Sequence, residues 1–375
     1  MQNISRLPGR KRRECELLAD VILICGINII HNGTESMKTN SNLTLKEKWL
    51  HLYDVTAKIA SYSPWDAFGE DDTFAYIWKD RSKCVFFSFI NDSIGKRGIA
   101  CYIDEDNYLR ARARLASRNE KQEPVFMLQN AFICLWDDRE DLSKRDYELI
   151  KELGLKFRGR GAWLHFDKYK IGYTPSYLSE DEIDFLMVAL DNLHMMIRAI
   201  YEKGLDPEFD KRRTLVRGFD EDTGLYHTER FDIKPSSDAI LRPLVTVHES
   251  EHLNEVRSMK RADYSVQLDW SYVDAIYVDE DGCETFPLLL LAVEPKSGFV
   301  LFSRMFPPSY GQANAAFDAL DELCERHGKP SEIVICDEDL HAILSDACSK
   351  VGIRLTLQKR LPAVKKARTE FIAAL

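Results

Sequence analysis

The last third of the chain alternates strand-like and helix-like segments in an order that few folds accommodate. An alternating pattern at 266–274 is followed by an almost continuous apolar run at 286–293, which is typical of a strand buried on both faces. A third strand is predicted at 299–306, and Pro307 and Pro308 end it. The remaining predicted elements are helix 313–327, strand 333–336, helix 340–351, strand 353–357 and helix 363–375. This order predicts an α/β domain with a mixed sheet at 264–375.

Two carboxylates stand where this order could form a site. Asp269 lies in the first predicted strand, and Asp337 directly follows the fourth. Because ligands in open α/β sheets bind beyond the carboxyl ends of strands, Asp337 is a candidate site residue. If oxygens of the two side chains come within about 4–5 Å, they could share a divalent metal ion. The alternative is that an aspartate at a strand end serves as a turn or helix-cap residue.

This stretch resembles the ribonuclease H-like core of integrases and transposases. The resemblance rests on 267–270, on the turn at 294–298 and on 328–333 leading into Asp337. It implies a two-metal phosphoryl-transfer site with a third carboxylate about 35 residues after the second, which here is Glu370. Two departures stand out, since no Asn-Gly follows Asp337 and no long helix continues past Glu370. The alternative third carboxylate is Glu294.

An α+β domain is predicted at 44–205, before a charged stretch. Thr44 and Glu47 form a capping box that opens its first helix, and Ser179 and Glu182 open its longest helix. A shorter helix starts at Ser143 and stops near Gly154, which suits a left-handed helix end. The predicted strands are 73–77, 84–90, 98–103 and 125–136.

Arginine, glycine and aromatic residues are interleaved between the last two helices of this domain. Arg158, Arg160 and Trp163 could grip phosphates and stack on bases, as single-strand binders do. The alternative is that the aromatic residues anchor a long loop to the sheet while the arginines pair with nearby acids. Those acids are Asp137, Asp138 and Glu140.

The charged stretch at 206–263 is predicted to be a linker with a local helix at 249–259. It contains His248, Glu249 and His252 in the H-E-x-x-H spacing of zinc peptidases. Glu251 places a charge where that helix normally carries none, and no third ligand follows at an established spacing. We therefore interpret the motif as a solvent-facing helix and keep a zinc peptidase as the alternative.

The first 43 residues are predicted to be a disordered or mis-annotated extension, with 1–36 upstream of a second start at Met37. None of the nine cysteines shows C-x-x-C spacing, a pattern typical of reduced, buried thiols in a cytoplasmic protein. The net charge of -10 argues against a protein that coats nucleic acid along its whole surface. Basic residues do gather near the C-terminus, and we interpret them as a solvated helix face that opposes an acidic neighbour, with a local nucleic-acid-binding patch as the alternative. Its members are Arg354, Lys359, Arg360, Lys365, Lys366 and Arg368.

Over 44–370 the chain also resembles an uncharacterised bacterial two-domain family, whose domains are described as of unknown function. The signatures are Trp49, Leu52, Tyr53, Pro64, Trp65, 138–144, 154–159, Ala162, Trp163, 294–298 and 361–363. This resemblance implies no mechanism.

Two classes of function remain open. The first is a non-catalytic cytoplasmic protein that uses an integrase-like fold for binding, with no cofactor and with a protein or nucleic acid as partner rather than a membrane. The second is a nuclease or related phosphoryl-transfer enzyme that uses Asp269, Asp337 and Glu370 and requires Mg²⁺ or Mn²⁺ held by the two aspartates.

Overall fold

The computed structural model describes residues 43–69, 71–91, 96–116, 125–232 and 240–374, so the expected extension at 1–36 lies outside it. The chain forms two compact units. Unit 1 comprises the chain up to Ala113, Asn130–Tyr169 and Pro175–Ile240, and unit 2 comprises Arg114–Gln129, Lys170–Thr174 and Leu241–Leu375. No helix in the described ranges is long and apolar enough to cross a membrane.

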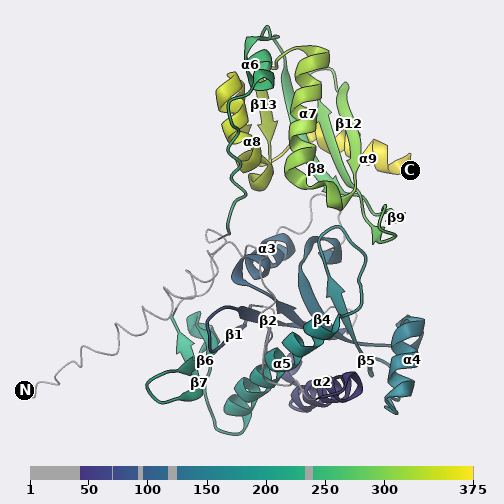
Figure 1. The fold of residues 1–375 in the computed structure, drawn as a ribbon, viewed down its shortest axis with the longest axis vertical. Helices are drawn as coiled ribbons and strands as arrows, with labels where there is room; N and C mark the ends of the chain where they lie inside the picture. The colour runs from purple at the N-terminus through teal and green to yellow at the C-terminus, as the bar shows by residue number, and fades with distance from the viewer. Residues whose placement is uncertain (1–42, 70, 92–95, 117–124, 233–239, 375) are drawn as a thin grey trace, which may run out of the picture. The chain divides into compact units, whose positions relative to one another are not determined.

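Unit 1 is built on a seven-stranded sheet in the order β5-β4-β3-β2-β1-β6-β7 (Figure 1). Among the described strands of this sheet, β1 and β6 pair in parallel, and the other neighbours are antiparallel. The strands are β1 (Thr73–Ile77), β2 (Cys84–Asn91), β3 (Arg97–Tyr102), β4 (Ala131–Asp137), β5 (Trp163–Tyr169), β6 (Thr214–Asp220) and β7 (Leu225–Phe231). The strands predicted at 73–77, 84–90 and 98–103 are thus confirmed, whereas 125–136 divides into a 3-10 turn (Val125–Leu128) and β4.

Helices cover both faces of this sheet. The helices α2 (Leu45–Ala60) and α5 (Glu180–Tyr201) pack on one face, and both predicted capping boxes are present. The opposite face is covered by α3 (Glu105–Ala116), which contributes Tyr108 and Leu109 to a second core (Figure 1). The short helix α4 (Lys144–Glu152) follows β4 and precedes the edge strand β5.

The structure corrects the linker predicted at 206–263. Two of its segments are strands of unit 1, because β6 pairs with β1 and buries Leu215 and Val216. The apolar part of β6 spans few residues, and β7 is an edge strand with mostly exposed side chains. Neither segment therefore carries the long periodic pattern from which strands are predicted.

Unit 2 is built on a five-stranded sheet in the order β12-β11-β8-β13-β14. Its strands are β8 (Ser265–Tyr272), β11 (Leu288–Val293), β12 (Val300–Phe306), β13 (Glu332–Ile335) and β14 (Arg354–Leu357), and a separate small ribbon joins β9 (Tyr277–Val278) to β10 (Glu284–Thr285). The strand β11 runs antiparallel to β8 and β12, while β8, β13 and β14 are parallel. The mixed sheet and the order of elements predicted from the sequence are confirmed.

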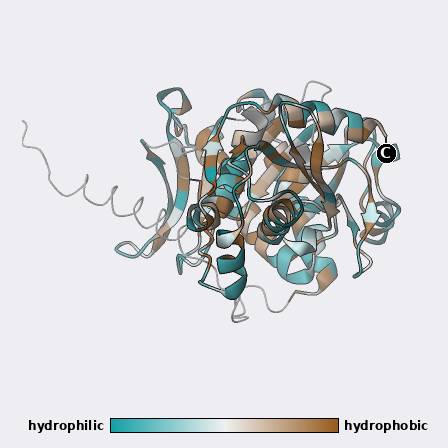
Figure 2. Cartoon of the chain, turned by 90° about the horizontal axis from the view of Figure 1, so that it is seen from above, coloured by the Kyte–Doolittle hydropathy of each residue, from teal (hydrophilic) through white to brown (hydrophobic). Residues whose placement is uncertain are grey.

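The sheet of unit 2 separates two apolar layers. One face packs against α6 (Glu251–Ser258), α7 (Gln312–His327) and α8 (Glu338–Val351), and the other packs against α9 (Pro362–Ala373). Hydrophobic residues accordingly gather on the strands, and polar residues on the outer helix surfaces (Figure 2). Successive residues of β8 alternate between the layers, so Leu268 and Trp270 face α7 and α8 while Asp269 faces α9.

Candidate functional site

Asp269 is buried in an ion pair with Arg368 of α9. Its side chain is 3% exposed and that of Arg368 is 8% exposed, and Asp269 Oδ2 lies 2.5 Å from Arg368 Nη2. The neighbouring Gln267 faces the same helix, where its Oε1 accepts hydrogen bonds from the backbone N–H groups of Ala363 (2.9 Å) and Val364 (3.3 Å). The polar side chains on this face of β8 therefore hold α9 in place.

Asp337 caps the N-terminus of α8. Its Oδ1 accepts hydrogen bonds from the backbone N–H groups of Asp339 and Leu340, both at 3.0 Å. Since α8 packs on the opposite face of the sheet from α9, Asp337 and Asp269 serve helices on different faces. This is the capping role that the sequence left open as an alternative.

The remaining predicted carboxylates lie elsewhere. Glu370 is exposed on α9 and sits 3.9 Å from Lys366, and Glu294 closes the turn before β12 by accepting from Ser297 N at 2.9 Å. Among the described residues, the group of three His, Cys, Asp or Glu side chains that approach within 4.8 Å does not include Asp269, Asp337 or Glu370. The predicted three-carboxylate metal site is therefore not assembled.

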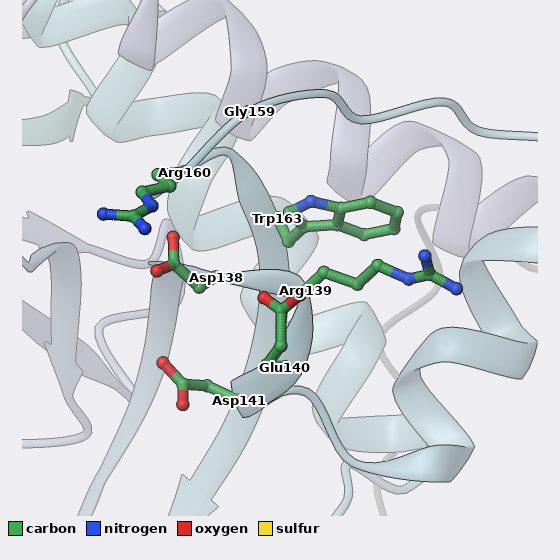
Figure 3. A pocket seen from close by; sticks show the side chains of 7 residues that line it. All are labelled: Asp138, Arg139, Glu140, Asp141, Gly159, Arg160 and Trp163. Atoms are coloured by element: carbon green, nitrogen blue, oxygen red, sulfur yellow. The ribbon is translucent and has the colours of Figure 1, made fainter.

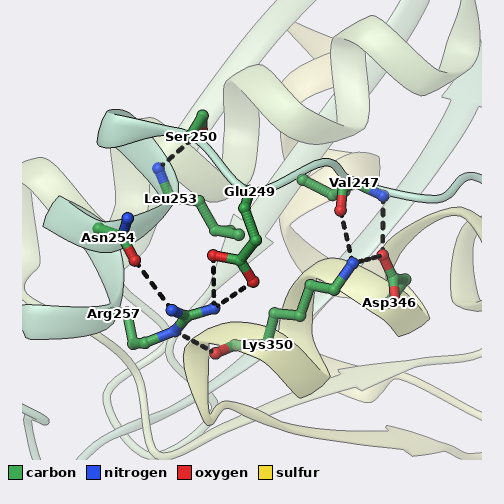
Figure 4. Close-up of polar contacts among 8 residues, drawn as sticks. All are labelled: Val247, Glu249, Ser250, Leu253, Asn254, Arg257, Asp346 and Lys350. Atoms are coloured by element: carbon green, nitrogen blue, oxygen red, sulfur yellow. Dashed lines mark hydrogen bonds and ion pairs between the residues drawn. The ribbon is translucent and has the colours of Figure 1, made fainter.

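The H-E-x-x-H spacing does not form a zinc helix. Ser250 is the N-cap of α6, and its Oγ accepts from Leu253 N at 3.1 Å, so His248 and Glu249 precede the helix (Figure 4). Glu249 pairs with Arg257 at 2.9 Å. His252 Nε2 lies 3.0 Å from Asp321. The two histidines are therefore not placed on one helix face, which the zinc helix requires.

Unit 1 carries a cavity of about 550 Å³ where the loop before β5 approaches the end of β4. It is lined by Asp138, Arg139, Glu140, Asp141, Gly159, Arg160 and Trp163 (Figure 3). The loop is tied down where Asp138 Oδ1 accepts from Gly161 N at 2.6 Å. The guanidinium of Arg139 lies 5.0 Å from the ring centroid of Tyr147 and 5.9 Å from that of Trp163. Arg139 thus lies against two aromatic rings.

The structure shows part of each alternative for the arginine-rich loop: its aromatic residues anchor it to the sheet, but its arginines are not paired with the nearby acids. Trp163 is half-buried against the core of unit 1, and its ring centroid lies 5.9 Å from that of Phe157, so aromatic residues anchor the loop. In the described part of the chain, however, neither Arg158 nor Arg160 forms an ion pair. In Figure 3 the Arg160 side chain extends beside Asp138 at the edge of the cavity. Both guanidinium groups therefore remain available to a partner.

A buried cluster of titratable groups lies along β5, beside α4. Ligand atoms of Asp146, His165 and Asp167 all lie within 4.8 Å of one another. His165 Nδ1 is 3.2 Å from Asp167 Oδ2, and His165 Nε2 is 3.1 Å from Asp137 Oδ2. Asp137 Oδ1 lies in turn 2.8 Å from Lys96 Nζ. We call Asp146, His165 and Asp167 the β5 cluster.

Local structure explains why these side chains converge. His165 and Asp167 are two residues apart on a strand and so point to the same face. Asp146 is held in the first turn of α4, where Ser143 is the N-cap and its Oγ accepts from Asp146 N at 3.0 Å. The alternation of His165 and Asp167 is visible in the sequence, but the position of Asp146 depends on how α4 packs at the sheet edge. Sequence reasoning missed the cluster for that reason.

Burial and neighbouring charges shift the pKa values here in different directions. Burial raises the pKa of Asp146. Burial acts to lower the pKa of His165, but the carboxylates of Asp167 and Asp137 outweigh it and raise that pKa. Burial also opposes ionisation of Asp137, yet Lys96 and His165 hold the pKa of its carboxyl below the ordinary value. The carboxylates around His165 therefore favour its protonated form, and burial favours the protonated form of Asp146.

Two family models match the chain. Residues 49–217 match a family described as "Domain of unknown function (DUF7309)", and residues 252–372 match "Domain of unknown function (DUF6930)". No curated protein matches. The expected resemblance to families of unknown function is thus found, with each match falling largely within one unit.

Solved integrase structures are weakly similar to the chain. The catalytic core domain of BIV integrase is 17% identical over 30% of this chain and 64% of that one, with a TM-score of 0.22. A chain of the simian T-cell lymphotropic virus intasome, in complex with PP2A regulatory subunit B56 gamma, is 18% identical over 35% and 43%, with a TM-score of 0.23. The chain therefore spans less than two thirds of the structures it matches, and the scores carry no conclusion about activity.

Proposed function

We propose that this chain is a non-catalytic binding protein in which unit 2 has a ribonuclease H-like fold without a metal centre. The observation that carries the proposal is the Asp269–Arg368 ion pair. A guanidinium at 2.5 Å already compensates the charge that a metal ion would compensate in the integrase-type site. Removing it to admit a metal would leave one of two buried charges without its partner, at a cost of about 3–5 kcal/mol.

The fold assignment is supported by the order of elements in unit 2. Three strands precede helices that alternate with two further strands, and the first strand lies at the centre of the sheet. This is the arrangement that the resemblance to the ribonuclease H-like core implies. A fold of this kind serves many functions, so activity has to be inferred from the side chains, and here they hold helices α8 and α9.

A reducing compartment such as the bacterial cytoplasm suits the cysteines. In the described part of the chain they are free thiols, and most are buried: Cys84, Cys101, Cys134, Cys283, Cys324, Cys336 and Cys348. Buried thiols behave as small apolar side chains and persist where disulfides do not form.

The recognition surface we propose is the cavity of unit 1, and its partner is a polypeptide segment. Three carboxylates, those of Asp138, Glu140 and Asp141, line it together with the unpaired Arg160. A nucleic acid presents only negative charge to such a surface and would be repelled by the carboxylates. A peptide that carries both cationic and anionic groups matches both signs of charge, and Trp163 offers an aromatic surface beside them.

Peptide selection against the full chain tests this surface. We expect Arg160→Ala to weaken a selected peptide about 10-fold or more, because a charge-assisted hydrogen bond contributes about 1.5–3 kcal/mol. Arg158→Ala is the matched control, since Arg158 lies in the same loop and is also exposed but does not line the cavity. Equal affinities of the two variants, or a single-stranded oligonucleotide that binds more tightly than any peptide, would contradict the proposed surface.

A further inference from the structure

The β5 cluster has the composition of a divalent metal site. It combines one imidazole with two carboxylates, and its ligand atoms already lie within 4.8 Å of one another. Ligands around a tetrahedral Zn²⁺ sit about 2.0–2.2 Å from the metal, and hence roughly 3.3–3.6 Å from each other. Side-chain rotations at Asp146 or Asp167 that bring the ligand atoms closer by at most about 1.5 Å close the difference.

Within the β5 cluster, the side chain of His165 gives the strongest indication that a metal ion binds there. Its side chain is 8% exposed, and its buried Nδ1 has no hydrogen-bond partner among the described residues. Nδ1 lies 3.2 Å from Asp167 Oδ2, which is close enough for a hydrogen bond, so it is the angle between the two groups that prevents one. A buried polar atom without a hydrogen bond is destabilising, and a metal ion between Nδ1 and the two carboxylates would give this nitrogen a partner.

The residues around His165 orient its imidazole ring for metal coordination. Asp137 Oδ2 lies 3.1 Å from His165 Nε2 and accepts a hydrogen bond from it, so Nδ1 is the ring nitrogen that can coordinate a metal ion once its proton is released. Metal-binding histidines are commonly oriented by a carboxylate in this way. Lys96 compensates Asp137 at 2.8 Å, so the charges left to neutralise are those of Asp146 and Asp167. One divalent cation balances those two charges.

We propose that Asp146, His165 and Asp167 bind one first-row transition-metal dication such as Zn²⁺, with Asp137 orienting His165. Imidazole favours such ions over Mg²⁺ and Ca²⁺, which prefer all-oxygen sites. Three protein ligands leave a coordination position for water or for a ligand group. Asp167 is the most exposed of the three ligands, with a side chain that is 15% exposed. This site differs from the sequence-based expectation of no cofactor, and it is independent of the proposed peptide surface.

Metal binding by the full chain, without an affinity tag, tests the site directly. After chelator treatment we expect about one equivalent of Zn²⁺ by calorimetry, and visible absorption bands on addition of Co²⁺ that Zn²⁺ abolishes. Wild-type protein that binds neither ion would overturn the proposal. That result needs no variant and leaves the peptide surface untouched.

Variants then locate the ion. Asp167→Asn keeps the shape of a partly exposed side chain, and we expect it to abolish the Co²⁺ bands. Asp137→Asn, which changes only the orienting carboxylate, should weaken Zn²⁺ about 10–100-fold. His252→Gln is the control, because His252 also pairs with an aspartate, at 3.0 Å, but lies outside the cluster. A Co²⁺ spectrum that survives Asp167→Asn, or is lost in His252→Gln, would refute this assignment of ligands.

Discussion

Replacing Arg368 by alanine tests the buried ion pair at the centre of unit 2. The substitution leaves the buried carboxylate of Asp269 without its cation, and it also removes the aliphatic stem that packs α9 against the sheet. Breaking a buried pair from one side costs about 3–5 kcal/mol. Because a domain is stabilised by about 5–15 kcal/mol in total, we expect a large fraction of the stability of unit 2 to be lost.

Hydrogen exchange of peptides that cover β8 measures this loss in unit 2 without contributions from unit 1. Removing both partners, with Asp269→Asn and Arg368→Met together, should recover most of the stability, because no buried charge remains. Arg257→Ala is the matched control: its pair with Glu249 is exposed and contributes about 1 kcal/mol or less. A loss below about 1 kcal/mol in Arg368→Ala, or restoration of its stability by Mn²⁺, would refute the account of this pair.

Three further substitutions test other parts of the structure by chemical denaturation. Asp337→Ala removes the cap of α8 and should cost about 1 kcal/mol, and no measurable loss would contradict the capping role. Gly172→Ala should cost about 2–4 kcal/mol, because Gly172 has a φ of +78° and a Cβ there would lie 2.7 Å from side-chain atoms of Tyr272 and Pro308. Gly282→Ala is the control and should cost less, because a Cβ at Gly282 has no neighbouring atom within 4 Å. Burial acts to raise the pKa of Glu182, but Lys168 and the backbone N–H of Ser179 outweigh it and lower that pKa below its ordinary value of 4.5. The stability that the Glu182 carboxylate contributes is therefore present above the unfolded pKa and is lost as the pH falls below it. Wild type should therefore exceed Glu182→Gln in stability at pH 7 and approach it as the pH falls through the lowered pKa, and a difference independent of pH would contradict that reasoning.

The order of elements in unit 2 could be predicted because each signal is local. The apolar run that becomes β11 and the glycine at position 328 that ends α7 lie next to the elements they define. The strands β6 and β7 could not be predicted in this way. The strand β6 pairs with β1, which lies more than a hundred residues earlier, and β7 pairs with β6, so neither strand depends on its own apolar pattern.

The candidate site was predicted less well for a related reason. The positions of Asp269 and Asp337 in the order of elements are correct, but the sequence does not show which helix each side chain meets. Arg368 lies 99 residues after Asp269, and only the packing of α9 brings the two together. The β5 cluster depends in the same way on a helix at the edge of the sheet, which places Asp146 beside a strand that follows it in the chain.

Calorimetric titration with Mn²⁺ tests most directly whether the carboxylates of unit 2 bind metal. The comparison is between wild type, Asp337→Ala, and the double variant that combines Asp269→Asn with Arg368→Met. We expect the three isotherms to superimpose, because any Mn²⁺ bound at the β5 cluster is unaffected by these changes in unit 2. A binding event that is present in wild type and lost in both variants would show that Asp269 and Asp337 share a metal ion, and would contradict the proposed non-catalytic role.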